Sequence, residues 1–372
     1  MTLAERIRAA ARRLGFDPVG ITSADPVEED RAHLLDWIAR GAHGSMAYLA
    51  REPARRADPR AVFPGARSVI SLGLAYATRG APEGEGARVA RYARGRDYHK
   101  LIWKRLRALE VAIAEESGRP FAGRTFVDTG PLLERALARR AGLVFVGKNT
   151  MLIHPLHGSY LFLATVLTDL ELPADAPGRT ACGACTLCLD ACPTQALTPY
   201  RMEATRCLSY LTIEERGPIA PALRPAVGGW AFGCDICQEV CPYNRQARDT
   251  AEPDFATQRG AGAALDLAAV LALSDTDAFL RAFSGTPLTR PKRDGLVRNA
   301  CLAAAHLGRH DLVPLLCERL ADESPVIRGA AAWALGRLGG TTAERALEVA
   351  RERERDTTVQ AEIASALEVK AA

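Results

Sequence analysis

Eight of the ten cysteines lie between residues 182 and 241, and their spacing is typical of iron–sulfur ligands. The first run, CGACTLCLDACP at 182–193, has the pattern C-x2-C-x2-C-x3-C-P. In bacterial ferredoxins this run binds one 4Fe–4S cluster through its first three thiolates, while the fourth thiolate binds a second cluster. Three thiolates on a tight loop can hold three irons of one cubane, and the fourth leads into the next segment.

A second run, CDICQEVCP at 234–242, provides the partner but is one cysteine short of the standard pattern. Cys207, which lies between the two runs, supplies the eighth thiolate. The sequence therefore predicts two 4Fe–4S clusters. We expect one to be held by Cys182, Cys185, Cys188 and Cys241, and the other by Cys192, Cys207, Cys234 and Cys237.

Other uses of these cysteines explain less of the pattern. A zinc ribbon needs only two Cys-x2-Cys pairs and would leave four cysteines without a role. A thioredoxin-type redox pair needs one such pair and a different fold around it. Cys301 and Cys317 lie outside the cluster, in a helical region, and are expected to be ordinary buried thiols.

The composition is that of a globular protein with room for two or three domains, with 372 residues, 48% of them hydrophobic and 25% charged. A net charge of +4 permits an anionic partner without requiring one. The N-terminus, MTLAERIRAAARRLGF, has apolar residues at helical spacing and no run of signal-peptide or membrane length. We therefore expect an amphipathic surface helix there, a cytoplasmic protein with no membrane contact, and reduced cysteines that bind metal.

The elements that would position this chemistry alternate between strand and helix before residue 175. Apolar runs at 68–77, 124–130 and 160–170 predict buried strands, and 97–117 and 131–142 predict helices. This pattern indicates a layered α/β domain. GEGARVARY, from residue 84, lacks the third glycine and the preceding strand of a dinucleotide fingerprint, which argues against nicotinamide binding.

The last third of the chain is helical, rich in alanine and internally repeated. VRNACLAAAHLG at 297–308 is similar to VIRGAAAWALGRLG at 326–339, and a weaker copy begins at Val359. A period near thirty residues, with two helices in each unit, predicts a short HEAT-like solenoid with an extended surface. Basic residues at its start form either a solvated charged face or a surface for an anion. These residues are Arg290, Lys292, Arg293 and Arg298.

Proline- and glycine-rich or polar stretches at 172–179 and 244–262 flank the cysteine region. We therefore predict three parts: an α/β catalytic domain at 1–175, a ferredoxin-type two-cluster module at 176–250, and a linker with helical repeats at 251–372. About 300 residues lie outside the cluster module, far more than an electron carrier needs. This favours a redox enzyme with its own electron relay.

Several long motifs closely resemble those of the epoxyqueuosine reductase family. They are ARYARGRDYHKL at 90–101, FVDTGPLLERALARRAGLVFVGKNTMLI at 126–153, CGACTLCLDACPTQAL, RCLSYLTIE and GCDICQEVCPYNR. The resemblance implies a cobalamin-dependent enzyme with two 4Fe–4S clusters, whose cobalamin domain is similar to that of reductive dehalogenases. It implies the last step of queuosine synthesis, reduction of the epoxide of epoxyqueuosine at the tRNA wobble position. It also implies a monomer that depends on an external low-potential electron donor.

The resemblance assigns roles to residues of this sequence. Asp128 in FVDTGP matches the family's proton donor, a role that needs a partly desolvated pocket. Without the resemblance, Asp128 would be read as a helix cap before Pro131. His99 in DYHKLI is not assigned as a cobalt ligand, because Ile102 replaces the glycine of the cobalamin mutase signature. The residues expected to bind the corrin are Arg55, Arg56, Arg91, Tyr92, Asp128, Lys148, Asn149, Ser209 and Tyr210.

A tRNA substrate would explain why the enzyme carries a helical solenoid. An anticodon loop presents phosphates and splayed bases, so the basic residues at 290–298 are expected to position its backbone while the modified base enters the cofactor pocket. Two alternatives remain at this point. A related dehalogenase-like reductase of a small molecule would have no evident need for the repeats. A non-enzymatic electron-transfer or RNA-binding module would leave the N-terminal domain unexplained.

Overall fold

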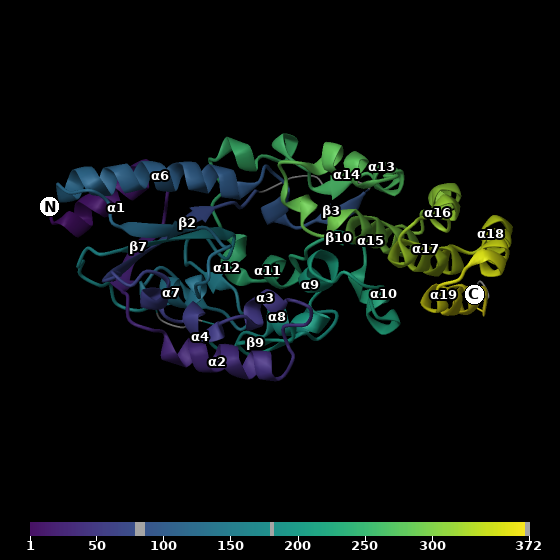
Figure 1. Ribbon diagram of the computed structural model, residues 1–372, viewed down its shortest axis with the longest axis horizontal. Coiled ribbons are helices and arrows are strands. Elements are labelled where there is room, and N and C mark those ends of the chain that lie inside the picture. The colour runs from purple at the N-terminus through teal and green to yellow at the C-terminus, as the bar shows by residue number, and fades with distance from the viewer. Residues whose placement is uncertain (79–85, 179–181, 369–372) are drawn as a thin grey trace. The chain divides into compact units, whose positions relative to one another are not determined.

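The computed structural model describes residues 1–78, 86–178 and 182–368 (Figure 1). It divides into two compact units. Unit 1 contains Met1–Arg79, Asp97–Ala204 and Ile236–Glu252, and unit 2 contains Gly80–Arg96, Thr205–Asp235 and Pro253–Ala372. The cysteine region is thus shared between the units, and the three-part division at 175 and 250 stays a prediction. Within the described ranges no helix is both long and apolar enough to span a bilayer.

A four-stranded antiparallel sheet forms the centre of unit 1. Its order is β1 (Val19–Ser23), β2 (Ser68–Ala75), β7 (Leu161–Thr168) and β4 (Gly123–Phe126). The central strands β2 and β7 are almost wholly buried, as expected for strands covered on both faces. The predicted buried strands at 68–77 and 160–170 are confirmed. The segment 124–130 is a strand only as far as Phe126, and β4 is not buried as predicted.

Helices cover both faces of this sheet, which gives the predicted layers (Figure 1). Helices α1 (Leu3–Arg13) and α6 (Tyr98–Ser117) lie on one face, and α7 (Glu134–Arg140) lies on the other. The predicted amphipathic character of the N-terminal helix is confirmed, because α1 buries the face that carries Ile7. The Asp97 side chain caps α6 by accepting a hydrogen bond from the backbone N–H of His99.

Short elements complete unit 1 around the cysteines and the loops. A two-stranded hairpin, β5 (Phe145–Val146) and β6 (Leu152–Ile153), lies between α7 and β7 in the chain. The short helices are α2 (Glu28–Ala39), α3 (Ala47–Ala50), α4 (Pro53–Arg56), α5 (Pro59–Val62), α8 (Leu187–Asp190), α11 (Ile236–Glu239) and α12 (Pro242–Arg245). A second hairpin pairs β8 (Leu197–Thr198) with β9 (Arg201–Met202).

Unit 2 begins with a small sheet assembled from distant segments. Strand β3 (Ala87–Val89) lies between β10 (Trp230–Phe232), which is parallel to it, and β11 (Ala264–Leu265), which is antiparallel. Helices α9 (Leu208–Ile213) and α10 (Arg224–Val227) precede β10 in the chain. Strand β3 lies within GEGARVARY, the segment that lacks the glycine spacing of a dinucleotide fingerprint.

The helical repeats form the remainder of unit 2 and share one core with its small sheet. The repeat helices are α15 (Lys292–His306), α16 (Val313–Arg319), α17 (Pro325–Leu338), α18 (Thr341–Arg353) and α19 (Thr357–Glu368). Two further helices precede them, α13 (Leu267–Leu271) and α14 (Thr276–Phe283). Equivalent apolar residues of the three copies, Val297, Ile327 and Val359, are all buried. The repeat prediction is confirmed.

Candidate functional site

Asp128 lies on an exposed turn directly after β4, with its carboxyl held from one side. Its φ of +58° is in the left-handed region, which is uncommon for a residue other than glycine and often marks a functional site. The hydroxyl of Tyr98 donates a 2.5 Å hydrogen bond to Oδ2 of Asp128. Helix α7 begins only at Glu134, with Leu133 as its N-cap residue. The helix-cap interpretation of Asp128 is therefore wrong.

Tyr98 is itself fixed by aromatic packing. Its ring stacks on Phe162 at a centroid distance of 3.9 Å and on His99 at 4.2 Å, and only 6% of the residue is exposed. The Nδ1 of His99 lies 2.7 Å from Oδ1 of Asp97. A buried ring that can move little presents its hydroxyl to Asp128 in one direction, which orients the carboxyl.

A second carboxyl, that of Glu134, lies close to Asp128. Oε1 of Glu134 accepts a 3.0 Å hydrogen bond from the hydroxyl of Thr165, on the buried strand β7. The residue as a whole keeps some solvent exposure, but its carboxyl is enclosed by protein. Burial, followed by the negative charge of Asp128, raises the pKa of Glu134 to about 8, against the opposing effect of hydrogen bonds from Thr165 and the Asp128 backbone.

Four cysteine side chains gather in unit 1, and they are the four predicted to hold one cluster. Burial raises the pKa of the Cys188 thiol, and the neighbouring thiols of Cys182, Cys241 and Cys185 raise it further. The same effect on Cys241 comes from burial first and then from nearby cysteines. Cys241 and Cys182 also pack around one apolar cluster with Phe145. Four thiols on two distant segments therefore lie near one another in unit 1.

Backbone N–H groups point at these sulfurs. The N–H of Lys148 lies 3.4 Å from Sγ of Cys182, and backbone N–H groups of Tyr243 and Asn244 hydrogen-bond to Cys241. Such N–H···S bonds stabilise thiolates and adjust the reduction potential of a bound cluster. They are the expected surroundings of a cluster.

Lys148 and Asn149, both predicted to bind the corrin, contact the cysteine loops. Nζ of Lys148 donates to the carbonyl oxygens of Gly183 at 2.8 Å and Cys185 at 3.0 Å. Nδ2 of Asn149 donates to the carbonyl oxygen of Cys237 at 3.3 Å. Both side chains therefore anchor the cysteine loops of unit 1, whatever else they bind.

The other four cysteines are divided between the units. Cys192 and Cys237 belong to unit 1, and Cys207 and Cys234 belong to unit 2. Sγ of Cys192 accepts a 3.4 Å hydrogen bond from the N–H of Ala196. Their assignment to the second cluster stays a prediction.

No three His, Cys, Asp or Glu side chains among the described residues converge on a position for a single metal ion. Outside the cluster region, Cys301 is buried as predicted, and burial raises its pKa to about 12. Cys317 is only half-buried.

The remaining residues predicted to bind the corrin are divided between unit 1 and unit 2. In unit 1, a terminal nitrogen of Arg56 donates to the carbonyl oxygen of Tyr48 at 2.7 Å. The Nε atoms of Arg55 and Arg56 are buried with no hydrogen-bond partner in the described part of the chain. The others belong to unit 2, as Arg91, Tyr92, Ser209 and Tyr210.

In unit 2, Arg91, Tyr92 and Tyr210 have local partners. The backbone N–H of Arg91 donates to Oδ2 of Asp235 at 2.7 Å. The ring of Tyr92 lies 5.9 Å from that of Phe232, and the hydroxyl of Tyr210 donates to Glu215 at 3.0 Å.

Two of the four basic residues predicted to contact RNA are interior. Arg298 is 1% exposed and donates to the carbonyl oxygens of Leu211, Glu215 and Gly217 at 2.6 to 2.9 Å. Arg293 is 7% exposed and pairs with Asp322. The prediction that these two arginines contact phosphates is wrong, because their guanidinium groups are buried and already bonded within unit 2.

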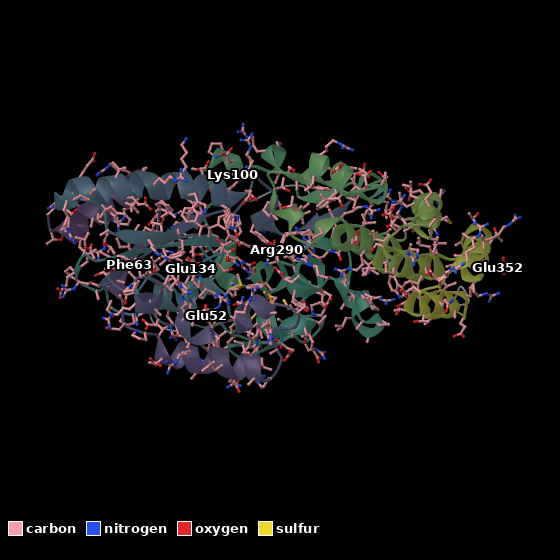
Figure 2. The ribbon with its side chains drawn as sticks, viewed as in Figure 1. Glu52, Phe63, Lys100, Glu134, Arg290 and Glu352 are labelled. Carbon is pink, nitrogen blue, oxygen red and sulfur yellow. The ribbon has the colours of Figure 1, made fainter. Side chains whose placement is uncertain are left out.

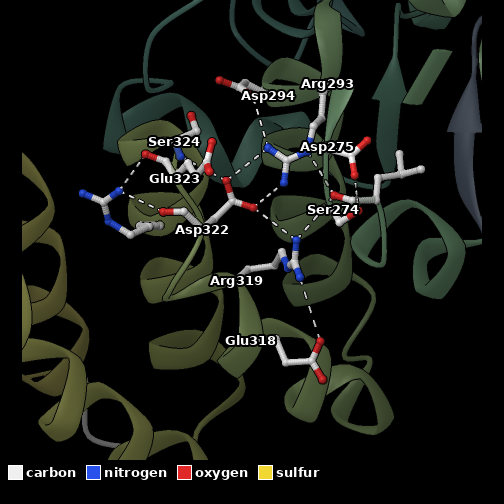
Figure 3. Close-up of polar contacts among 11 residues, drawn as sticks. Ser274, Asp275, Arg293, Asp294, Glu318, Arg319, Asp322, Glu323 and Ser324 are labelled. Carbon is white, nitrogen blue, oxygen red and sulfur yellow. Dashed lines mark hydrogen bonds and ion pairs between the residues drawn. The ribbon is translucent and has the colours of Figure 1, made fainter. Parts of the chain in front are cut away.

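Figure 3 shows how Arg293 and Arg319 converge on the carboxylate of Asp322. Arg293 also donates to the carbonyl oxygen of Leu273 at 3.0 Å. This buried network joins α15 to the loop between α16 and α17, so it stabilises the solenoid. Arg290 and Lys292 are exposed, although Arg290 pairs with Glu214 at 2.8 Å (Figure 2).

Sequence reasoning missed two members of the site, Tyr98 and Glu134. Both occur in the motifs used above, at DYHKL and PLLERAL. Neither follows a spacing rule that would connect it to Asp128, because the contacts arise from the packing of α6, β7 and the turn after β4. The only available signal was the presence of a tyrosine and an acid in those motifs.

Family models match three parts of the chain. "Epoxyqueuosine reductase QueG, DUF1730" matches residues 56–129, "4Fe-4S double cluster binding domain" matches 181–244, and "HEAT repeats" matches 291–368. Together with the gathered thiols, these matches define a class: an iron–sulfur oxidoreductase that carries a helical repeat module.

Comparison with whole proteins is more specific. The chain is 42% identical over 347 residues to the epoxyqueuosine reductase of Xanthomonas campestris pv. campestris, covering 90% of this chain and 96% of that one. The chain therefore belongs to the epoxyqueuosine reductase family.

Two solved structures of this family share nearly the whole fold. A crystal structure of epoxyqueuosine reductase with an epoxyqueuosine-modified tRNA-Tyr stem loop has a TM-score of 0.91 and 33% identity, covering 99% of this chain and 98% of the other. The Bacillus subtilis enzyme, captured with its aspartate-bearing catalytic loop swung out of the active site, has a TM-score of 0.89 and 32% identity, with the same coverage.

Proposed function

We propose that this chain reduces the epoxide of epoxyqueuosine at the wobble position of tRNA to give queuosine. The observation that carries the proposal is the presence, in one unit, of four gathered thiols and an exposed carboxyl fixed by Tyr98. They occur in a chain 42% identical to an epoxyqueuosine reductase over 90% of its length. The solved relative with a modified stem loop supports tRNA as the substrate.

The clusters would relay electrons. Cys182, Cys185, Cys188 and Cys241 would hold one cluster, since their thiols lie together. The second would be held by Cys192, Cys207, Cys234 and Cys237. An external low-potential donor would supply the electrons, which the clusters pass on singly.

Cobalamin would be the cofactor at which the epoxide is reduced, because cobalt can combine single electrons into a two-electron step. The buried Nε atoms of Arg55 and Arg56 fit such a group, since corrin side chains present amide and phosphate acceptors. The other candidate residues are Arg91, Tyr92, Asp128, Lys148, Asn149, Ser209 and Tyr210. The cobalamin fold would be the one that reductive dehalogenases use.

Asp128 would supply the proton for the departing epoxide oxygen. Its carboxyl is exposed to an incoming ligand while Tyr98 fixes its direction. A positioned acid of this kind contributes about 10²- to 10⁴-fold to a rate. The aspartate-bearing catalytic loop of the Bacillus subtilis relative supports this role for the Asp128 turn.

The solenoid would position the tRNA. Of the four predicted contacts, Arg290 and Lys292 remain, because both are exposed and basic. We also propose a cytoplasmic monomer in which the predicted parts 1–175, 176–250 and 251–372 act as catalytic, relay and RNA-binding regions.

The deciding experiment incubates reduced, cobalamin-loaded protein with tRNA that carries epoxyqueuosine, followed by mass analysis of the nucleosides. We expect queuosine to appear at the expense of the epoxide. Persistence of the epoxide, in protein with both clusters reduced and cobalamin bound, would refute the proposal. A halogenated phenol in a parallel reaction tests the small-molecule alternative, which predicts loss of halide instead.

A further inference from the structure

A second carboxyl, that of Glu134, is hydrogen-bonded to the turn that carries Asp128. Glu134, the first residue of α7, accepts hydrogen bonds from the Thr165 hydroxyl at 3.0 Å and from the Asp128 backbone. Figure 2 marks Glu134 within unit 1. These bonds tie the turn to the central strand β7, whereas the bond from Tyr98 holds the Asp128 side chain. The two carboxyls therefore lie close together, but Asp128 is exposed and the carboxyl of Glu134 is enclosed by protein.

The charge of this pair matters for proton donation. When Asp128 gives a proton, that proton forms an O–H bond on the epoxide oxygen as the first C–O bond breaks, and Asp128 becomes a carboxylate. The second C–O bond then breaks, the oxygen leaves as hydroxide, which takes a further proton from solvent, and the two carbon atoms form a double bond. The two electrons that this requires would come from the external donor through the clusters. A neighbouring carboxyl that was already ionised would oppose the new negative charge, whereas an uncharged one would not.

We propose that Glu134 is a positioning residue that holds the Asp128 turn with an uncharged carboxyl, so that Asp128 can become the only carboxylate of the pair on giving up its proton. The inference rests on the proposed function of Asp128. It extends that function by naming what keeps the proton donor in place and able to ionise.

The charged surroundings agree with this arrangement. Burial, and after it the negative charge of ionised Asp128, raises the pKa of Glu134 to about 8, so Glu134 is mostly protonated at neutral pH when Asp128 is a carboxylate. Arg135, the next residue on α7, is the cation that interacts with Asp128, and it also donates to the carbonyl oxygen of Thr150 at 2.9 Å. Tyr98 and Thr165 contribute hydroxyl groups.

The first test compares pH–rate profiles of the cobalamin-loaded wild type and Glu134→Gln, which keeps an acceptor oxygen and cannot ionise. Each profile is normalised to its own maximum, so the readout is the pH dependence and not the rate at any one pH. As pH rises through about 8, wild-type turnover should fall because Glu134 ionises, and the Gln variant should lack this decrease. An unchanged alkaline decrease in the Gln variant would overturn the proposal.

Glu110→Gln is the matched control. Glu110, on α6, accepts a 2.8 Å hydrogen bond from the Thr125 hydroxyl. The same substitution is therefore made at another carboxyl that accepts from a threonine hydroxyl. We expect this control to keep the wild-type profile. If the Gln variant at 134 does not fold, Thr165→Val removes the bond that lowers the pKa of Glu134 and should move the alkaline decrease to higher pH. An unmoved decrease would contradict the proposal.

A second readout needs neither cobalamin nor tRNA. The folded protein keeps a proton at Glu134 up to about pH 8, whereas the unfolded glutamate releases it near 4.5. The unfolded state is therefore increasingly favoured as pH rises between these values, and the stability of the wild type falls. The melting temperature of Glu134→Gln, measured relative to wild type, should therefore increase from pH 5 to pH 8.5. Equal pH dependence in both proteins would overturn the inference, even if the tRNA assay had failed for a separate reason.

Discussion

The hydroxyl of Tyr98 lies 2.5 Å from Oδ2 of Asp128, thirty residues further along the chain. This contact joins the first residue of α6 to the turn after β4. The tyrosine is buried against Phe162, but the carboxyl it orients is exposed. A carboxyl fixed from the protein side and open on the other is arranged to meet a ligand.

Asp128→Asn should keep both clusters and the fold but lose most of the turnover. The amide has nearly the same shape and cannot supply the proton, so we expect a decrease of about 10²- to 10⁴-fold in kcat. The measurement is single-turnover conversion of epoxyqueuosine, with iron content and the melting temperature as controls. Wild-type turnover would show that Asp128 is not the acid.

Tyr98→Phe should lower kcat about tenfold with a smaller change in KM, because the ring remains packed while the orienting hydrogen bond is lost. Tyr76→Phe is the matched control, since Tyr76 also packs against Phe162, at a centroid distance of 4.4 Å. Equal effects of the two substitutions would assign Tyr98 a packing role only.

Cys241→Ser should cost one cluster. The protein should fall from about eight iron atoms to about four, because three thiolates and a serine hold a cubane poorly. Iron and acid-labile sulfide analysis, with the absorbance of the anaerobically purified protein, measures this loss. Cys317→Ser, in the repeats, should retain the full iron content. Full iron content in the Cys241 variant would show that the predicted ligand set is incorrect.

Arg298→Met and Lys292→Met should separate stability from RNA binding. Burial lowers the pKa of Arg298 to about 10, and its loss leaves one buried and two half-buried carbonyl oxygens without their donor. We expect about 3 kcal/mol less stability in denaturant unfolding. Lys292→Met should leave stability within about 0.5 kcal/mol. It should weaken stem-loop binding and reduce the salt slope by about one. The reverse pattern would restore Arg298 as an RNA contact.

Glu354→Gln should weaken the repeats in a pH-dependent manner. Hydrogen bonding to Arg328 lowers the pKa of Glu354 to about 2, and both side chains are largely buried. A depressed carboxyl pKa stabilises the fold above the unfolded value near 4.5, and this stability is lost as pH falls towards 2. We expect the variant to lose about 2 to 3 kcal/mol at pH 7 and little near pH 2. Parallel stability curves would exclude this effect.

Local patterns in the sequence were enough to predict the strands β2 and β7, the helix α6 and the repeats. The cysteine spacing predicted that Cys182, Cys185, Cys188 and Cys241 lie near one another, because ligand spacing reflects cluster geometry. The grouping of the other four cysteines stays a prediction. The role of Tyr98 could not be predicted, since it depends on how α6 packs against the turn after β4. Arg293 and Arg298 were misassigned because a basic sequence segment does not reveal whether its side chains point into the core.

Strand β3 also constrains how the chain can be synthesised and folded. Its partner strands, β10 and β11, begin at Trp230 and Ala264, more than a hundred residues later. At about 5 to 20 residues per second on the ribosome, roughly seven to thirty seconds pass between the synthesis of β3 and that of β10. Removal of the C-terminal residues from 253 onward would also take away β11 and the core that β3 shares with the repeats. The repeats are therefore part of the folding unit that contains β3. A chain truncated at residue 253 would expose the edge of β3 that pairs with β11, and such an edge is prone to aggregation.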